Sequence, residues 1–125
     1  MTHLILILLL LVSFYASLHG PRNQPPVALE DQYFLLFNPA PVVEIAVLDN
    51  DHDPDGDVLT VKALHGAEGG QAEIIDGRIV RVYPDWSREY SEPFGLVAYG
   101  VYVVSDGQVD SWSVWSVWHW PYMPL

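Results

Sequence analysis

Short apolar runs separated by turn residues dominate the chain from about residue 27 onward. Runs of this kind, rich in Val, Ile, Tyr and Trp, are typical of β-strands. Outside the first twenty residues, no stretch shows the apolar spacing of an amphipathic helix. The pattern therefore predicts about seven strands. They are expected at residues 27–37, 42–48, 58–64, 71–75, 78–83, 96–104 and 109–120.

The turns between these runs have their own signals. Asp-Gly pairs at residues 76–77 and 106–107 each lie between two β-prone runs, which is the strongest short-range hairpin signal. Residues 65–70 are expected to form a Gly-rich turn, and residues 84–95 an irregular loop. The sequence therefore predicts an all-β fold, an antiparallel β-sandwich of immunoglobulin-like type.

The N-terminal segment differs from the rest of the chain. Residues 4–12 are an unbroken apolar run, shorter than the ~20 residues of a membrane span and suited to a signal peptide. No Lys or Arg precedes the run. We expect residues 1–20 to be a signal peptide, with an uncleaved N-terminal anchor or a buried element of the domain as alternatives. We expect residues 21–26 to be a proline-rich linker, residues 27–120 to be the domain, and residues 121–125 to be a tail.

Charge and cysteine content narrow the function. The chain has 5 Lys plus Arg against 16 Asp plus Glu, a formal charge of −11. This balance argues against nucleic acid, whose affinity comes from basic residues, and against an anionic membrane surface beyond an N-terminal anchor. It favours cations. The absence of cysteine rules out disulfides and thiolate zinc sites, and the leader predicts a secreted or cell-surface location.

An aspartate-rich loop at residues 49–57 is the most conspicuous polar feature. Its oxygen donors are Asp49, Asn50, Asp51, Asp53, Asp55 and Asp57. Close carboxylates repel one another by on the order of 1 kcal/mol per pair, and a divalent cation removes that cost. Calcium suits such a set because it takes six to eight oxygens in flexible geometry. The alternative is a solvated turn in which Asp side chains cap backbone amides.

Residues 51–56 match the opening half of the helix–loop–helix calcium pattern, D-x-D-x-D-G. The twelfth position of that pattern is Lys62 instead of Glu, and β-type runs flank the loop. The loop is therefore not that motif, and we interpret it as a calcium-type loop between strands.

The segments NQPPVA (residues 23–28), VLDNDHDPDGDVLTV (residues 47–61) and YVVSDG (residues 102–107) resemble the bacterial cadherin-like, immunoglobulin-like repeats of large surface adhesins. The resemblance covers about residues 23–118. It implies a β-sandwich, extracellular calcium binding and a structural or adhesive role. Asp51, Asp53, Asp55 and Asp57 are the implied ligands, followed by Asp49 and Asn50, with Asp31 and Asp106 as distant candidates. Family members usually form tandem arrays, whereas this chain holds one copy.

Four tryptophans crowd the last expected strand. If residues 112–120 are extended, Trp112, Trp118 and Trp120 share one face and Trp115 lies on the other. Exposed aromatic patches mark interaction sites, so Trp112, Trp115 and Trp118 are candidates for contact with a protein or glycan partner, or for self-association. The alternative is a core strand with some exposed rings.

The scattered histidines form no catalytic triad spacing, and no phosphate-binding Gly loop is present, so we expect no enzyme. The favoured function is a secreted or cell-surface calcium-binding module with a structural or adhesive role. One alternative is a carbohydrate-binding module that stacks sugars on the three candidate tryptophans or on Trp86. The other is a subunit that self-assembles into an extracellular filament or surface layer.

Overall fold

The computed structural model describes residues 2–19, 22–87 and 95–121. The elements follow one another as α1 (Thr2–His19), β1 (Asp31–Leu36), β2 (Val43–Ile45), the 3-10 helix η1 (Val47–Asn50), β3 (Thr60–Glu68), β4 (Gly70–Ile75), β5 (Ile79–Pro84), β6 (Gly95–Ser105) and β7 (Asp110–Trp120). The predicted loop at 84–95 and tail at 121–125 fall largely outside the described residues.

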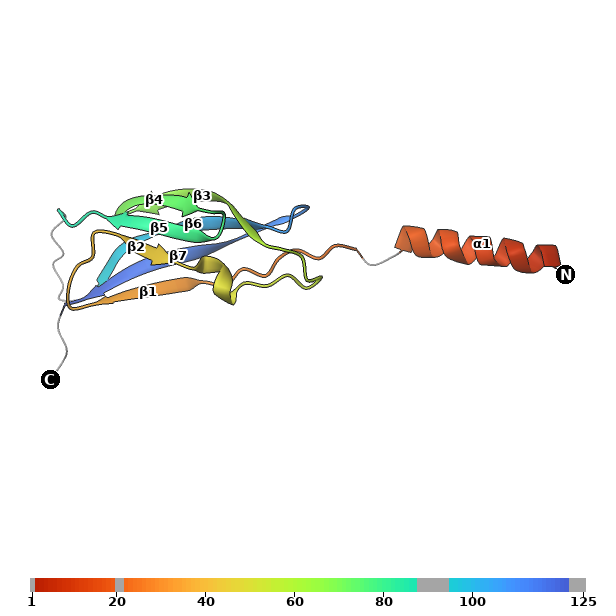
Figure 1. The fold of residues 1–125 in the computed structure, drawn as a ribbon, viewed down its shortest axis with the longest axis horizontal. Coiled ribbons are helices and arrows are strands. Elements are labelled where there is room, and N and C mark those ends of the chain that lie inside the picture. The colour runs from red at the N-terminus through yellow and green to blue at the C-terminus, as the bar shows by residue number, and fades with distance from the viewer. Residues whose placement is uncertain (1, 20–21, 88–94, 122–125) are drawn as a thin grey trace.

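The strands form two facing sheets, as Figure 1 shows. One sheet has the order β1-β7-β6-β3 and the other the order β2-β5-β4. The predicted β-sandwich is therefore confirmed. One pair departs from the antiparallel pattern, because β1 runs parallel to β7, with Asp31 opposite Trp115. These are the first and last strands, so the rest of the domain serves as the long connection that a parallel pair requires.

Valines from both sheets form the core together with two large aromatic residues, Tyr102 and Trp115. Trp115 is 0% exposed, and its ring lies against Gly100, where an added Cβ would come within 2.6 Å of the indole. The expectation that Trp115 contributes to a contact surface is therefore wrong. The alternation along β7 correctly predicted that Trp115 lies on the opposite face from the other three tryptophans. Only the fold shows that this face is the one packed into the core.

Both Asp-Gly hairpins are confirmed. Asp76 and Gly77 have φ angles of 52° and 65°, and the turn is closed by the Arg78 amide donating to the Ile75 carbonyl at 3.0 Å. The first of these angles is tolerated by Asp, and the second is natural for Gly. In the other hairpin, Asp106 N donates to Val109 O at 3.3 Å.

Two local predictions are wrong. The expected turn at residues 65–70 is mostly strand, since β3 continues to Glu68 through a register shift, and the chain reverses at Gly69. An added Cβ at Gly69 would overlap the Val97 carbonyl, so the reversal needs glycine. The expected strand at 42–48 is cut short, because the chain leaves the sheet after Ile45 and enters η1.

The N-terminal region also differs in part from expectation. The apolar side chains of residues 4–12 are 55–72% exposed in α1, so they add nothing to the sandwich core. Among the described residues, no helix has both the length and the apolar character needed to cross a membrane. The predicted linker is not free throughout, because Pro26 is buried and its carbonyl accepts a hydrogen bond from Ser111 Oγ at 2.6 Å.

Candidate metal centre

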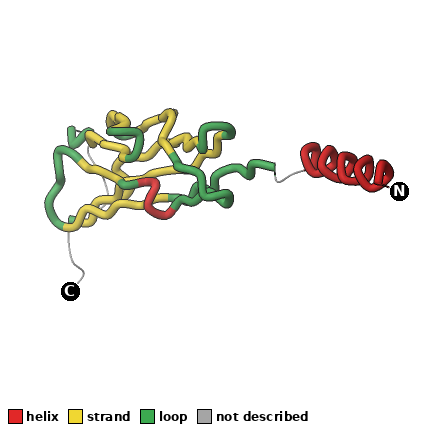
Figure 2. The backbone as a smooth tube through the Cα atoms, turned by 45° about the vertical axis from the view of Figure 1, so that its right-hand side comes forward, coloured by secondary structure: helices red, strands yellow, loops and turns green. Residues whose placement is uncertain are grey.

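The aspartate loop lies at the end of the sandwich where the chain enters from α1 (Figure 2). The entering segment runs beside the loop and is hydrogen-bonded to it. Val27 and His52 exchange backbone hydrogen bonds of 2.7 and 3.1 Å. Gln24 N donates to Asp55 Oδ2 at 2.6 Å, and Leu29 N donates to Asp51 Oδ1 at 2.8 Å. Residues 24–29 therefore hold the loop in place from outside the sheets.

Asp53, Asp55 and Asp57 form an outer carboxylate cluster. One oxygen from each lies within 4.8 Å of the other two. Asp53 organises the turn, since its Oδ1 accepts from the amides of Asp55 at 2.9 Å and Asp57 at 3.2 Å. Its carbonyl accepts from Gly56 N at 3.0 Å, and Gly56 has a φ of 78°. The other oxygen, Asp53 Oδ2, is buried and has no hydrogen-bond partner among the described residues.

Asp106, in the β6–β7 turn, approaches this outer cluster. Its Oδ1 accepts from Gln108 N and Val109 N, both at 2.7 Å, and its Oδ2 accepts from Asn23 Nδ2 at 2.7 Å. Hydrogen bonds from Val109, Asn23 and Gln108 hold the pKa of Asp106 below its usual value.

Asp57 faces the same concentration of negative charge. Partial desolvation, followed by repulsion from Asp53, Asp106 and Asp55, raises the pKa of Asp57. No hydrogen bond of the Asp57 carboxylate is described. The outer cluster is therefore a group of mutually repelling acids. Arg78 lines the same hollow as Asp53 and Asp57, but among the described residues no ion pair reaches the cluster.

Asp51 belongs to a different, inner cluster. The Tyr102 hydroxyl lies 2.8 Å from Asp51 Oδ2 and 2.9 Å from the Leu29 carbonyl. Burial raises the pKa of Asp51, and the hydrogen bonds from Leu29 and Tyr102 oppose the rise. Burial, with the hydrogen bond to Asp51, raises the pKa of Tyr102 as well. Tyr102 is therefore a neutral phenol that anchors the carboxylate.

Asp31 completes the inner cluster from the start of β1. Burial, and then the neighbouring carboxylates of Asp51 and Asp49, raise the pKa of Asp31 to about 6, against opposing hydrogen bonds from Tyr102 and Asn50. Its Oδ2 is buried and has no hydrogen-bond partner among the described residues.

The structure thus divides the ligands that the resemblance implied. It brings three of the four leading candidates together and turns Asp51 inward. Asp49 and Asn50 lie in η1, where Asn50 Nδ2 donates to the Glu30 carbonyl at 3.1 Å. The two distant candidates divide likewise, Asp106 with the outer cluster and Asp31 with the inner one. The sequence did not single out Tyr102 or Asn23, because neither carries a metal-ligand signal.

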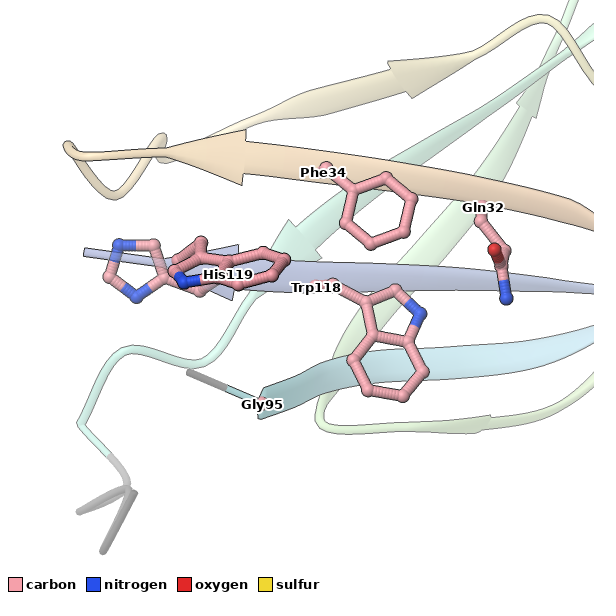
Figure 3. A pocket seen from close by; sticks show the side chains of 6 residues that line it. Gln32, Phe34, Gly95, Trp118 and His119 are labelled. Carbon is pink, nitrogen blue, oxygen red and sulfur yellow. The ribbon is translucent and has the colours of Figure 1, made fainter. Parts of the chain in front are cut away.

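The tryptophans have separate environments. Trp112 is 67% exposed and Trp118 is half-buried, and Trp118 stacks on Phe34 with ring centroids 6.4 Å apart. Figure 3 shows these two rings side by side. Trp86 is half-buried at the same end of the molecule. Its Nε1 donates to the Ala40 carbonyl at 2.7 Å, and its ring meets His119 edge to face at 5.1 Å.

Two facing sheets, an interior tryptophan and Asp-Gly hairpins define an immunoglobulin-like β-sandwich. The family model described as "Bacterial Ig domain" matches residues 23–114, well over half of the chain. The chain therefore belongs to the bacterial Ig domain family, which confirms the resemblance at that level and supports a structural or adhesive role. The match begins at Asn23, in agreement with the docked entering segment.

Two further comparisons add little. A search of curated proteins found no match. Among solved structures, the chain is similar to an endo-fucoidan hydrolase of glycoside hydrolase family 107, with a TM-score of 0.47 and 16% identity. The similarity covers 78% of this chain and 16% of the hydrolase chain.

Proposed function

We propose that this chain is a binding module of the extracellular surface, structural or adhesive in role and without catalysis, in which Asp53, Asp55 and Asp57 hold one calcium ion. The observation that carries the proposal is the outer cluster, with three carboxylate oxygens within 4.8 Å of one another. Calcium accepts such oxygens together with backbone carbonyls and water, and its flexible geometry suits a turn.

The charge balance at the loop supports a cation. The ion pairs among the described residues join Lys62 to Asp110 and Arg81 to Glu44 and Glu73, and none reaches the outer cluster. Asp53 Oδ2 lacks a hydrogen-bond donor among those residues. A divalent ion would satisfy this oxygen and remove the repulsion that raises the pKa of Asp57.

The location of the site indicates what the ion would do. Asp55 is bonded to the entering chain through Gln24 N, and Asp106, beside the cluster, is bonded to it through Asn23. An ion on the outer cluster would therefore fasten the aspartate loop to the entering segment, which leads into the sandwich from its N-terminal side. Such an ion would stiffen the domain at its N-terminal junction, a property suited to a load-bearing surface protein.

The test is thermal unfolding of residues 22–125, which contain every residue of the core, in calcium and in chelator. Calcium at ~100 times its dissociation constant adds about 2.7 kcal/mol, which raises Tm by roughly 10 °C for a domain of this size. Asp57→Asn should abolish the shift. It should also raise Tm slightly in chelator, because it relieves repulsion without removing a described hydrogen bond.

Asp76→Asn is the matched control, because Asp76 lies in a hairpin turn outside the cluster, where Asn tolerates the same backbone. It should keep the full calcium shift. Equal Tm values for the unsubstituted domain in calcium and chelator would reject the ion. An undiminished shift in Asp57→Asn would reject the outer cluster as its site.

A further inference from the structure

The outer face of the four-stranded sheet is apolar in a molecule that is otherwise acidic. Strand register and alternation place one set of side chains on it: Gln32, Phe34 and Leu36 from β1, Leu96, Tyr99, Val101 and Val103 from β6, and Trp112, Val114, Ser116, Trp118 and Trp120 from β7. On this face only one residue of these three strands is charged, Asp110 at the start of β7, whereas the chain has a formal charge of −11.

Among the described residues, charged groups lie only at the margin of this face. Lys62 of β3 pairs with Asp110 at 2.8 Å, which leaves no net charge beside Trp112, and Glu68 lies at the far end of β3. An acidic protein repels its own copies over most of its surface. This face is where two copies can meet without that repulsion.

The two ends of the face differ in shape. Trp112 projects at one end and is 67% exposed. At the other end lies a hollow of about 270 Å³ whose lining, part of which Figure 3 shows, consists of Gln32, Phe34, Gly95, Trp118, His119 and Trp120. The polar atoms of Gln32 and His119 contribute little to its surface, which is almost wholly apolar. A glycan site needs convergent polar groups among its aromatic rings. This lining suits an apolar side chain better.

We propose that the outer face of the β1-β7-β6-β3 sheet is a homodimer interface, in which Trp112 of each copy fills the hollow beside Trp118 of the other. The strands of the two copies run antiparallel about a two-fold axis that lies in the interface, perpendicular to the strands. Such an interface is isologous, so each copy supplies both the projecting ring and the hollow.

The register of β7 fits this arrangement. The strand covers Asp110–Trp120, so its midpoint is residue 115. When two antiparallel copies overlap fully about that midpoint, residue 112 of one copy faces residue 118 of the other. The projecting Trp112 of one copy and the hollow beside Trp118 of the other therefore meet in the same register that gives the two strands their full overlap.

The size of the face is at the lower limit for a stable pair. Its four strands have 6, 11, 11 and 9 residues. At ~3.4 Å per residue and ~4.8 Å between strands, they cover roughly 600 Å². Standard specific interfaces bury about 600–1,000 Å² per partner, and the face lies at the lower end of that range. Sheets that pack face to face keep their strands within about 30° of alignment, which the antiparallel pairing satisfies.

The first test is sedimentation equilibrium of residues 22–125 from low to high micromolar concentration. The unsubstituted domain should sediment as a dimer, and Trp112→Ala should raise the dissociation constant by about 30-fold or more, as loss of an aromatic anchor in a pocket does. Val58→Ala removes another exposed apolar side chain, 85% exposed and outside this face. It should leave the dimer intact. Cooperative thermal unfolding of both variants at a concentration below that of dimer formation shows that the fold survives.

The second test uses the absence of native cysteine in the full chain. Val114→Cys, near the axis, should cross-link between copies with a short thiol reagent. Gln108→Cys, in the β6–β7 turn, should not, because antiparallel copies place these turns at opposite ends. A monomer at all concentrations would overturn the proposal, and so would cross-linking only at residue 108, growth into open filaments, or a glycan that binds Trp112 on a monomeric domain.

Discussion

The inner and outer carboxylate clusters are built from the same residue type in neighbouring positions, yet their chemistry differs. Asp51 receives the Tyr102 hydroxyl at 2.8 Å and the Leu29 amide at 2.8 Å, so both of its oxygens have donors. Asp53, two residues later, uses one oxygen to organise its turn and leaves the other without a donor among the described residues. Asp51 is therefore held by donors of the protein, whereas Asp53 keeps one oxygen free for an ion.

The backbone causes the difference. Along an extended strand, alternate aspartates would share one face. Here the Gly56 amide closes a turn on the Asp53 carbonyl, and Gly56 adopts a positive φ. Asp55 and Asp57 therefore curve back toward Asp53, while Asp51 stays beside the core and the Tyr102 ring.

Removing the phenol should have the largest effect. Tyr102→Phe removes the single phenolic proton that Asp51 Oδ2 and the Leu29 carbonyl share. The loss of a buried hydrogen bond to a charged partner costs about 2–3 kcal/mol. We expect that decrease in the free energy of unfolding by urea, with and without calcium, because the phenol is not part of the outer cluster.

Tyr99→Phe is the control for that substitution. Tyr99 belongs to the same strand but is 48% exposed on the outer face. The free energy of unfolding of the Tyr99→Phe domain should differ from that of the unsubstituted domain by less than about 0.5 kcal/mol. A calcium shift lost in Tyr102→Phe but kept in Asp57→Asn would reverse the roles assigned to the two clusters.

Much of the fold could be predicted from the sequence because its signals are local. The Asp-Gly pairs fixed two hairpins, and the short apolar runs fixed most strands. The extent of β3 could not be read, because Gly66 forms a bulge inside the strand and only Gly69 reverses the chain. That distinction depends on the Val97 backbone, which lies beside Gly69 in space and far from it in sequence.

The site could be predicted only in part, for the same reason. The spacing of the aspartates indicated a cluster, and Asp53, Asp55 and Asp57 form one. The inward turn of Asp51 depends on Tyr102, which is 51 residues away in the sequence. Likewise, both faces of β7 carry tryptophan, and only the approach of Gly100 shows that Trp115 is the buried one.

The second-largest expected effect is at Asp31, where a substitution should raise the free energy of unfolding instead of lowering it. The pKa of Asp31 is about 6 in the fold, against 3.8 for an unperturbed Asp. Between these values the folded state binds more protons than the unfolded state, so stability falls as pH rises from about 4 to about 6. Asp31→Asn should therefore stabilise the calcium-free domain at about pH 7 by on the order of 1 kcal/mol, after allowance for solvent screening.

A series of urea unfolding curves in chelator checks this. The gain from Asp31→Asn should be present at about pH 7 and absent at about pH 4, where the carboxyl is protonated in the fold. Asp76→Asn, at the hairpin turn, should show no such dependence. A substitution that destabilises the domain at neutral pH would mean that the Asp31 carboxylate is held by a charge or donor outside the inner cluster.

The smallest effect tests how the entering chain is fastened to the outer cluster. Asn23→Ala removes the 2.7 Å hydrogen bond to Asp106 Oδ2. The cost should be about 0.5–1 kcal/mol, because the contact is only partly buried. The pKa of Asp106 should rise, since Asn23 is one of the donors that lower it. Asn38→Ala, in an exposed connection after β1, should change neither quantity.

Calcium makes this small effect informative. If an ion on the outer cluster fastens the entering chain, hydrogen exchange at the amides of Gln24, Val27 and Leu29 should be faster in Asn23→Ala than in the unsubstituted domain in chelator. Calcium should restore much of the protection. The Gln24 amide is the most direct reporter, because it donates to Asp55 of the cluster. Protection that calcium leaves unchanged would mean that the segment docks through its own hydrogen bonds alone, and that an ion would stabilise the loop without stiffening the junction.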